Sequence, residues 1–302
     1  MAKFRISGIF NVDKPAGLTS HDVVVAIRRA SAQRRVGHAG TLDPTATGVL
    51  LICLGEATRV AEYLMAGRKV YRARIHLGVT TDTYDATGQV LSAAEVNLSR
   101  AEIERAASSF IGQVQQRPPM YSAVKREGQP LYSLARRGIE VEREARTVEI
   151  YDFRITGWSP PFLSAEITCS KGTYIRSLAH DLGQVLGCGA HLAELVRVAC
   201  GSFTLADAVP LSRLVDSLAA GNWQEYLLPL DVALSGYPAW TVDEETAKRI
   251  RHGQAVLIAD LPADAEPGTY RRVYSPQGTF LALLRYDDSR RRWQPDKVFV
   301  ND

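Results

Sequence analysis

Residues 36–50 read Val-Gly-His-Ala-Gly-Thr-Leu-Asp-Pro-Thr-Ala-Thr-Gly-Val-Leu, a run in which turn-forming and polar residues lie between two apolar segments. Gly40 and Gly48 permit backbone angles that other residues avoid, and Pro44 disfavours the helical conformation for the preceding Asp43. The pattern predicts a rigid loop that presents a single carboxylate. It is also typical of a surface turn whose aspartate bonds its own backbone, so the role of Asp43 depends on the rest of the chain.

The segments on either side of this loop have the periodicities of regular structure. A helix is expected to begin at Thr19 or Ser20, whose hydroxyls can cap it, and its far end leads into the basic segment 28–35, directly before the loop. After the loop, an apolar run of strand length is followed by residues 70–79, which alternate between apolar and polar side chains. Tyr71 lies on the apolar face of that strand, where a tyrosine is by default a core residue.

Arg176 occupies an awkward position for a cation. The apolar spacing predicts a helix over residues 173–186, which places Arg176 in the first turn, where the helix dipole is positive. An anionic partner is therefore expected. An active-site carboxylate is one candidate, and an ordinary surface ion pair is the other.

The composition is that of an ordinary globular protein, because 46% of the 302 residues are hydrophobic and 23% are charged. The length suggests a large domain and a small one. We place the boundary in a proline-punctuated region, so that residues 1–237 form the large domain and residues 238–302 form a small, mostly β domain. Within the large domain, residues 115–150 are expected to form either an insertion that grips RNA or an exposed insertion with balanced charge.

Neither secretion nor membrane insertion is indicated. The longest apolar run, Val49–Leu54, is far too short to span a bilayer, and the first residues lack the apolar stretch of a secretory signal. We therefore expect a cytoplasmic protein with no membrane partner. The four cysteines form no Cys-x-x-Cys pair, so they are interpreted as small core residues and not as metal ligands.

Positive charge is concentrated near the N-terminus. Residues 1–80 hold twelve Lys and Arg against five Asp and Glu, a surplus of +7, whereas the whole chain carries +3. Such a surplus is typical of a surface that binds phosphate backbones, although a solvated face that is balanced elsewhere gives the same count.

Several reaction classes lack their usual markers. The sequence contains no G-x-x-x-x-G-K-[ST] phosphate loop, no G-x-G-x-x-G dinucleotide fingerprint, no G-x-S-x-G nucleophile elbow, and no H-x-E with P-C-x-x-C of zinc deaminases. Nucleotide hydrolysis, redox chemistry and deamination are therefore disfavoured. A loop-held aspartate, nearby basic residues and a tyrosine that can stack remain, and these suit covalent or electrostatic chemistry at a sugar or a base.

Six blocks of the sequence carry a family resemblance. The central block runs from Gly37 to Leu50 around Asp43, and the others are residues 13–20, 69–71, 118–125, 171–176 and 189–192. In content and order these blocks resemble the TruB family of tRNA pseudouridine synthases, over roughly residues 8–235. Because several ordered motifs agree, the resemblance is specific. The tail resembles the family's RNA-binding PUA module by its length and strand content.

The resemblance implies an α+β fold, in which a mixed, mostly antiparallel sheet is flanked by helices and followed by a small, mostly β PUA-like domain. It implies that Asp43 is the catalytic carboxylate, that Tyr71 stacks on a flipped base and can assist proton removal, and that Arg176 partners Asp43 and lowers its pKa. The resemblance does not decide whether Asp43 acts as a nucleophile or as a base. Substrate contacts are implied for His38, Lys14, Lys125, Tyr174 and Lys171.

The implied reaction is isomerisation of uridine to pseudouridine at position 55 in the T-loop of tRNA, after the uridine is flipped out of the folded RNA. No cofactor and no metal are implied. The expected partner is tRNA, contacted at its T-arm and acceptor end by a monomer that needs no guide RNA. Two rivals stay open: a non-catalytic tRNA-binding or folding protein on the same scaffold, and a glycoside or nucleoside hydrolase that would release the free base.

Overall fold

The computed structural model describes residues 6–122, 125–126, 129–135, 137–139, 141–257 and 265–299. Within these residues, ten strands form one large sheet. The strands are β1 (Gly8–Lys14), β2 (Val36–His38), β3 (Thr47–Leu54), β4 (Lys69–Leu77), β7 (Gly112–Gln116), β10 (Arg146–Ser159), β11 (Phe162–Cys169), β12 (Ala190–Cys200), β13 (Phe203–Thr204) and β14 (Val209–Pro210).

The order of the main path is β14-β1-β3-β12-β4-β11-β10-β7, with β2 beside β3 and β13 beside β12. The β1–β14 and β12–β3 pairs are parallel, and the other pairs in this sheet are antiparallel. The predicted mixed, mostly antiparallel sheet is therefore confirmed. The parallel β12–β3 contact matters for the site, because it places β12 directly beside the start of β3, where the 36–50 loop ends.

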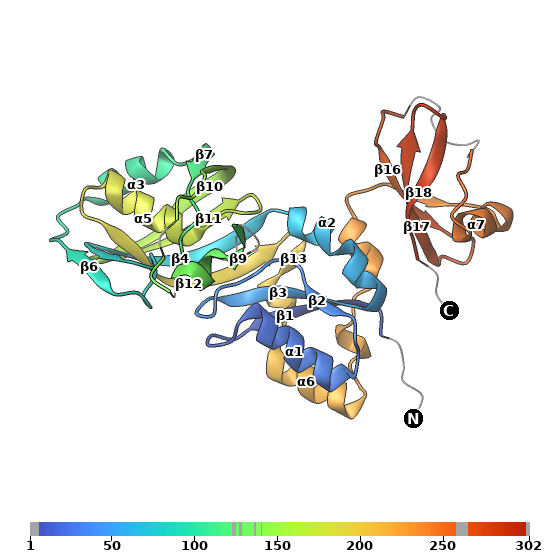
Figure 1. Cartoon of the computed structure of the whole chain (residues 1–302), viewed down its shortest axis with the longest axis horizontal. Helices are drawn as coiled ribbons and strands as arrows, with labels where there is room; N and C mark the ends of the chain where they lie inside the picture. Colours follow the sequence, from blue (N-terminus) through green and yellow to red (C-terminus); the bar gives the residue numbers. More distant parts are fainter. Residues whose placement is uncertain are drawn as a thin grey trace.

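Helices cover one face of the large sheet. They are α1 (Ser20–Ser31), α3 (Arg100–Ser108), α5 (Ile175–Val185) and α6 (Leu211–Ala220), and their apolar sides share one buried core with the strands. Figure 1 shows α1 and α6 side by side below β1 and β3, whereas α3 and α5 cover the other half of the sheet. The predicted cap of α1 is confirmed, because Thr19 forms a capping box, and Ser99 forms another at the start of α3.

One helix was not expected. Residues 201–237 have a mixed polar composition, yet α6 forms there between Pro210 and Gly221. Its buried residues are Leu211, Leu214 and Leu218, a spacing that places them on one side of a helix. This short apolar stripe is sufficient to stabilise α6, because it packs against the buried face of α1 and tertiary packing supplies most of the stability of a helix.

The C-terminal part of the chain forms a second sheet. Its strands are β15 (Ala239–Thr241), β16 (Tyr270–Tyr274), β17 (Phe280–Asp287) and β18 (Arg292–Val298), and α7 (Glu244–Arg251) packs on it. The mostly β character of this part is confirmed, while the boundary after residue 237 stays a prediction. Figure 1 shows this sheet beyond α2 (Ala61–Ala66), at the opposite end of the molecule from α3 and α5.

On the face of β1 and β3 opposite α1 and α6, the C-terminal sheet packs together with α2 and the 3-10 helix before it. Leu283 and Phe299 pack in one apolar cluster with Val60 and Leu64. Arg59 donates from Nη1 to the carbonyl of Val298, at 2.6 Å. The C-terminal sheet is therefore anchored on the face of the large sheet opposite α1 and α6.

Residues 115–150 contain the short strands β8 (Lys125–Arg126) and β9 (Gln129–Pro130), followed by α4 (Leu131–Ala135). Their expected grip on RNA stays a prediction. In the described part of the chain, no helix has the length and apolar character needed to cross a membrane.

Gly48 lies where β3 and β12 pair side by side. Its φ of +97° lies in a region that side chains avoid, and a Cβ added there would stand 2.3 Å from the carbonyl oxygen of Arg197. Because that oxygen belongs to the neighbouring strand, it cannot withdraw without disturbing the Arg197–Gly48 pairing. Only glycine fits at the end of the loop.

We expect Gly48→Ala to destabilise the protein more than an ordinary glycine substitution does. Gly221→Ala is the matched control, because Gly221 also has a positive φ, of +81°, but faces open space. The control should cost about 1–2 kcal/mol, the usual penalty of left-handed backbone for an alanine. Denaturant unfolding of both variants measures the difference. Equal losses would contradict a steric role for the β3–β12 contact.

Candidate active site

The 36–50 loop lies between the N-termini of α1 and α5. At the α1 end, the Ser20 hydroxyl accepts from the backbone N–H of Leu42 at 2.8 Å and lies 3.1 Å from the carbonyl oxygen of the same residue. At the α5 end, the loop meets Arg176. Two helix dipoles therefore direct their positive ends towards the segment that carries Asp43.

A buried arginine holds both limbs of the loop. Arg197, on β12, donates from Nη2 to the carbonyl of Gly40 at 3.1 Å, from Nη1 to that of Thr41 at 3.3 Å, and from Nε to that of Val49 at 2.7 Å. The side chain is only 2% exposed. The sequence analysis did not identify Arg197, and the one signal for it is a charged residue inside the apolar run 195–201.

Lys14 holds the same loop from β1. Its ammonium group donates to the carbonyls of Leu18 at 2.7 Å and Pro44 at 3.2 Å, and the residue is fully buried. Burial lowers the pKa of Lys14 to about 8, while the nearby Asp43 carboxylate opposes that change. In this structure the ammonium group of Lys14 supports the loop through backbone carbonyls, and its predicted contact with substrate stays a prediction.

Asp43 and Arg176 form a two-point ion pair. Arg176 Nε lies 2.8 Å from Oδ2 of Asp43, and Nη2 donates to Oδ1 at 3.0 Å. The arginine side chain is 5% exposed, whereas the aspartate side chain is 34% exposed. The expected anionic partner of Arg176 is thus a loop carboxylate and not a surface group. The ion pair leaves one side of Asp43 accessible from solvent.

A second carboxylate shares Arg176. Asp85 Oδ2 lies 3.6 Å from Nη1 of Arg176, and its Oδ1 accepts from the Thr83 hydroxyl at 2.8 Å and from the Thr87 backbone N–H at 2.9 Å. The sequence analysis missed Asp85. Its signal is weak, because Thr-x-Asp-x-Thr reads as an ordinary turn in which a carboxylate bonds nearby hydroxyls and backbone.

The pKa of Asp43 shifts in the direction opposite to our expectation. Burial raises the pKa above its ordinary value, and Asp85 adds to the rise, whereas Arg176 and Lys14 oppose it. The sequence-based expectation that Arg176 lowers this pKa considered the charge partner but not the burial or the second carboxylate, which together outweigh it.

Tyr71 is placed on the helical face of β4, as its alternation predicts, and is 8% exposed. It pairs across the sheet with Arg197, so the loop-binding arginine and the tyrosine are direct neighbours. Burial raises the pKa of Tyr71, and the positive charge of Arg197 opposes that change. The phenol is therefore protonated at neutral pH.

The other predicted contacts surround the loop. His38 lies on β2, half-buried, and burial together with the charge of Arg197 lowers its pKa, so the imidazole is neutral. Tyr174 precedes α5 and is half-buried, and Lys171 is exposed in the turn before it. The side chain of Lys125 lies outside the described residues.

The basic segment 28–35 lies farther from Asp43 than its sequence position suggests. Ser20, at one end of α1, touches the loop, whereas Arg29 is near the other end, about 14 Å away at the usual rise of a helix. Arg35 pairs with Glu56, while Arg29 and Arg34 are exposed. Arg29 and Arg34 therefore lie on the surface, away from the end of α1 that touches the loop.

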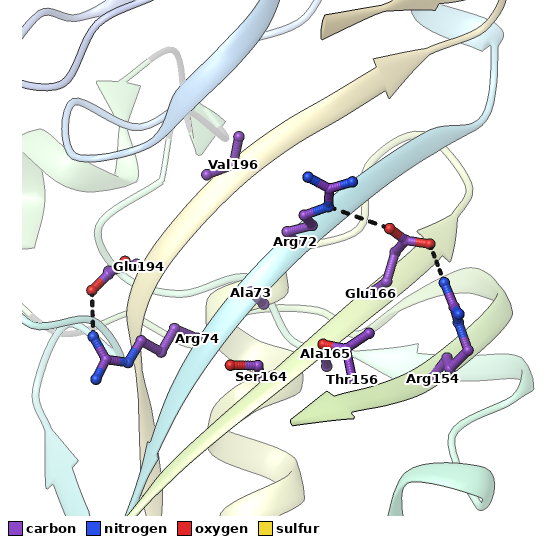
Figure 2. Close-up of a pocket in the computed structure, with 10 residues that line it drawn as sticks. All are labelled: Arg72, Ala73, Arg74, Arg154, Thr156, Ser164, Ala165, Glu166, Glu194 and Val196. Atoms are coloured by element: carbon purple, nitrogen blue, oxygen red, sulfur yellow. Dashed lines mark hydrogen bonds and ion pairs between the residues drawn. The ribbon is translucent and has the colours of Figure 1, made fainter. Parts of the chain in front are cut away.

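The opposite face of the sheet carries a hollow that is not the candidate site. Figure 2 shows that Arg72 and Arg154 both pair with Glu166 there, and that Arg74 pairs with Glu194. Successive side chains of a strand point to opposite faces, so Arg72 faces away from Tyr71. The hollow is a charge-balanced sheet surface.

We expect Asp85→Asn to lower the pKa of Asp43. Asparagine keeps the oxygen that accepts from Thr83 and Thr87, but it removes the negative charge that helps to hold the proton on Asp43. The Asp43 carboxylate should then stay ionised to a lower pH, as measured by carboxyl carbon NMR. Asp152→Asn, at an exposed position on β10, is the control and should change nothing. A raised or unchanged value in Asp85→Asn would contradict the shared-arginine arrangement.

Comparison with known proteins places this geometry in a family. Residues 28–175 match the family model described as TruB family pseudouridylate synthase (N terminal domain). Residues 176–235 match the tRNA pseudouridylate synthase B C-terminal domain, and residues 237–300 match the tRNA pseudouridine synthase II C-terminal domain.

Solved structures and curated relatives agree with these models. Chains of a Cbf5-Nop10-Gar1 complex and of an archaeal box H/ACA sRNP Nop10-Cbf5 complex have TM-scores of 0.74 and 0.73, at 27% and 26% identity, and each comparison covers 97% of this chain and 85% or 86% of the other. The tRNA pseudouridine synthase B of Syntrophotalea carbinolica is 44% identical over 95% of this chain and 94% of its own length. The protein of that name from Haemophilus influenzae is 42% identical, over 92% and 89%. This chain belongs to the TruB family of pseudouridine synthases.

Proposed function

We propose that this chain isomerises uridine to pseudouridine at position 55 in the T-loop of tRNA, as a stand-alone cytoplasmic monomer that needs no guide RNA. The observation that carries the proposal is the Asp43–Arg176 ion pair, in which a buried guanidinium holds a partly exposed carboxylate at the end of a rigid loop. The relatives named tRNA pseudouridine synthase B support tRNA as the substrate.

The reaction rearranges bonds within one nucleotide. The bond between C1′ of the ribose and N1 of the base breaks, the base rotates, and C5 bonds to C1′. C5 loses its proton and N1 gains one, so the product has the same composition and oxidation state as the substrate. The protein therefore has to open the RNA, orient the base and stabilise charge at the ribose.

Asp43 acts on the ribose in its ionised form, either as a nucleophile at C1′ or as a base. In both routes one oxygen must be free to approach the sugar while the carboxylate keeps its orientation. Arg176 meets the second requirement, since it contacts both oxygens from the buried side. The exposed side of the carboxylate meets the first.

Tyr71 provides the stacking surface for the flipped uracil. Stacking of a base on an aromatic ring stabilises the complex by about 1–3 kcal/mol, which offsets part of the cost of flipping, a few kcal/mol. The raised pKa of Tyr71 favours stacking over proton removal in the resting enzyme, because the phenol keeps its proton. His38, with a neutral ring, contributes by contact and not as an acid.

The RNA-binding surface extends beyond the site. Exposed Lys171 and half-buried Tyr174 lie beside the N-terminus of α5, and Arg29 and Arg34 are exposed near the far end of α1. The insertion 115–150 reaches the site, because the carbonyl of Tyr121 accepts from Arg176 at 2.9 Å. We assign the T-arm to this face and the acceptor end to the PUA-like C-terminal domain.

Asp43→Asn should abolish pseudouridine formation and leave tRNA affinity nearly unchanged. The amide keeps the size of the side chain but provides neither a nucleophile nor a base. Pseudouridine mapping on tRNA and a filter-binding assay measure the two properties. Continued isomerisation by Asp43→Asn would remove Asp43 from the mechanism, and an abasic site in tRNA treated with wild-type protein would indicate a hydrolase.

Affinity for tRNA should fall steeply with salt, because each phosphate that the protein neutralises releases counterions. Replacing Arg29 and Arg34 together by glutamine should reduce the slope of log affinity against log salt by about 1 for each phosphate that is no longer neutralised. The matched control replaces Arg72 and Arg74, which are paired on the opposite face of the sheet, and should leave the slope unchanged. A flat salt dependence of the wild type would contradict a basic RNA-binding surface.

A further inference from the structure

Helix α5 carries a second functional candidate one turn beyond Arg176. His180 follows Arg176 by four residues, so both side chains project from the same side of the helix. The ring of His180 stacks on Tyr84, with centroids 4.0 Å apart and ring planes 15° apart. Tyr84 immediately precedes Asp85, which shares Arg176 with Asp43. The carbonyl of Thr83 also accepts from Nη1 of Arg176, at 3.5 Å, so α5 contacts three consecutive residues of this turn.

Tyr84 has an unusual backbone conformation. Its φ is +62°, a left-handed value that is uncommon for bulky residues and costs free energy. The turn is held against β12, because the N–H of Leu192 donates to the carbonyl of Tyr84 at 3.0 Å and the N–H of Ala86 donates to that of Leu192 at 3.1 Å. A glycine would fit this backbone better. The presence of a tyrosine is therefore explained by its side chain and not by the backbone conformation of the turn.

The imidazole in this ring contact is neutral. Burial lowers the pKa of His180, and its buried Nδ1 has no hydrogen-bond partner among the described residues. The imidazole therefore contributes a flat surface and not a charge. That surface is covered by the ring of Tyr84, the residue directly before Asp85.

We propose that the Tyr84–His180 stack is a positioning pair that holds the Asp85 turn on α5 and so divides the Arg176 guanidinium between two carboxylates. The inference rests on the proposed role of Asp43. Neither ring touches the reacting atoms. The pair acts through Asp85 and Arg176.

Loss of the stack changes the site in a defined direction. The charged and titratable groups that face Asp43 are Arg176 on α5, Asp85 in the turn, Lys14 on β1 and Tyr174 before α5. If Asp85 moves away, Asp43 loses the repulsion that helps to raise its pKa and keeps the full attraction of Arg176. Arg176 also loses one of its two carboxylate partners, so the orientation of Asp43 becomes less uniform.

Tyr84→Gly is the decisive variant, because it removes the ring and at the same time relieves the left-handed backbone. The melting temperature should be unchanged or higher. In the pH range where it no longer changes with pH, the single-turnover rate of pseudouridine formation should fall at least about tenfold, as expected for small misplacements of a catalytic group. The acid limb of its pH profile should move to lower pH. Tyr84→Phe keeps the stack and should behave like the wild type.

His180→Leu tests the same contact from the helix and leaves the backbone of the turn unchanged. It should reproduce the rate loss and the shift of the acid limb, and adding Tyr84→Gly to it should cause little further change. A wild-type rate and pH profile in either single variant would overturn the inference, as would a rate loss with no shift of the acid limb. Activity of Asp43→Asn, in contrast, would overturn the proposed function itself.

Discussion

The site depends on placing one guanidinium at a helix start. Arg176 is almost fully buried at the positive end of α5, and its charge has to be balanced there by anions and carbonyl oxygens. Asp43, Asp85 and the carbonyl of Tyr121 provide that balance from three segments that are distant in sequence. The need to balance this buried cation therefore brings together the 36–50 loop, the turn that carries Asp85 and part of the 115–150 insertion.

The loop itself is shaped by cations that bind its backbone. Lys14 and Arg197 contact carbonyl oxygens on both sides of Asp43, so their bonds fix the path of the chain and leave the carboxylate for Arg176. Burying such cations is costly, and it lowers the pKa of Lys14. The benefit is a rigid loop, which the proposed catalytic role of Asp43 requires.

Part of this arrangement could be predicted from the sequence. The alternation of β4 and the capping residues of α1 are local patterns, and the awkward dipole environment of Arg176 indicated an anionic partner. Asp85 and Arg197 could not be found in the same way, because their partners lie far along the chain and their own surroundings read as a turn and a strand. The predicted direction of the Asp43 pKa shift was wrong for a related reason. Charge neighbours can be guessed from motifs, but burial depends on how the whole sheet and its helices close over the loop.

The backbone contacts of Lys14 and Arg197 have an evolutionary consequence. Since these side chains recognise carbonyl oxygens, which every residue has, the shape of the loop is encoded largely outside the loop. Exposed positions such as Thr41 and Thr45 can therefore change without moving Asp43. Selection can adjust how the loop surface fits its RNA while the position of the reactive carboxylate is inherited unchanged.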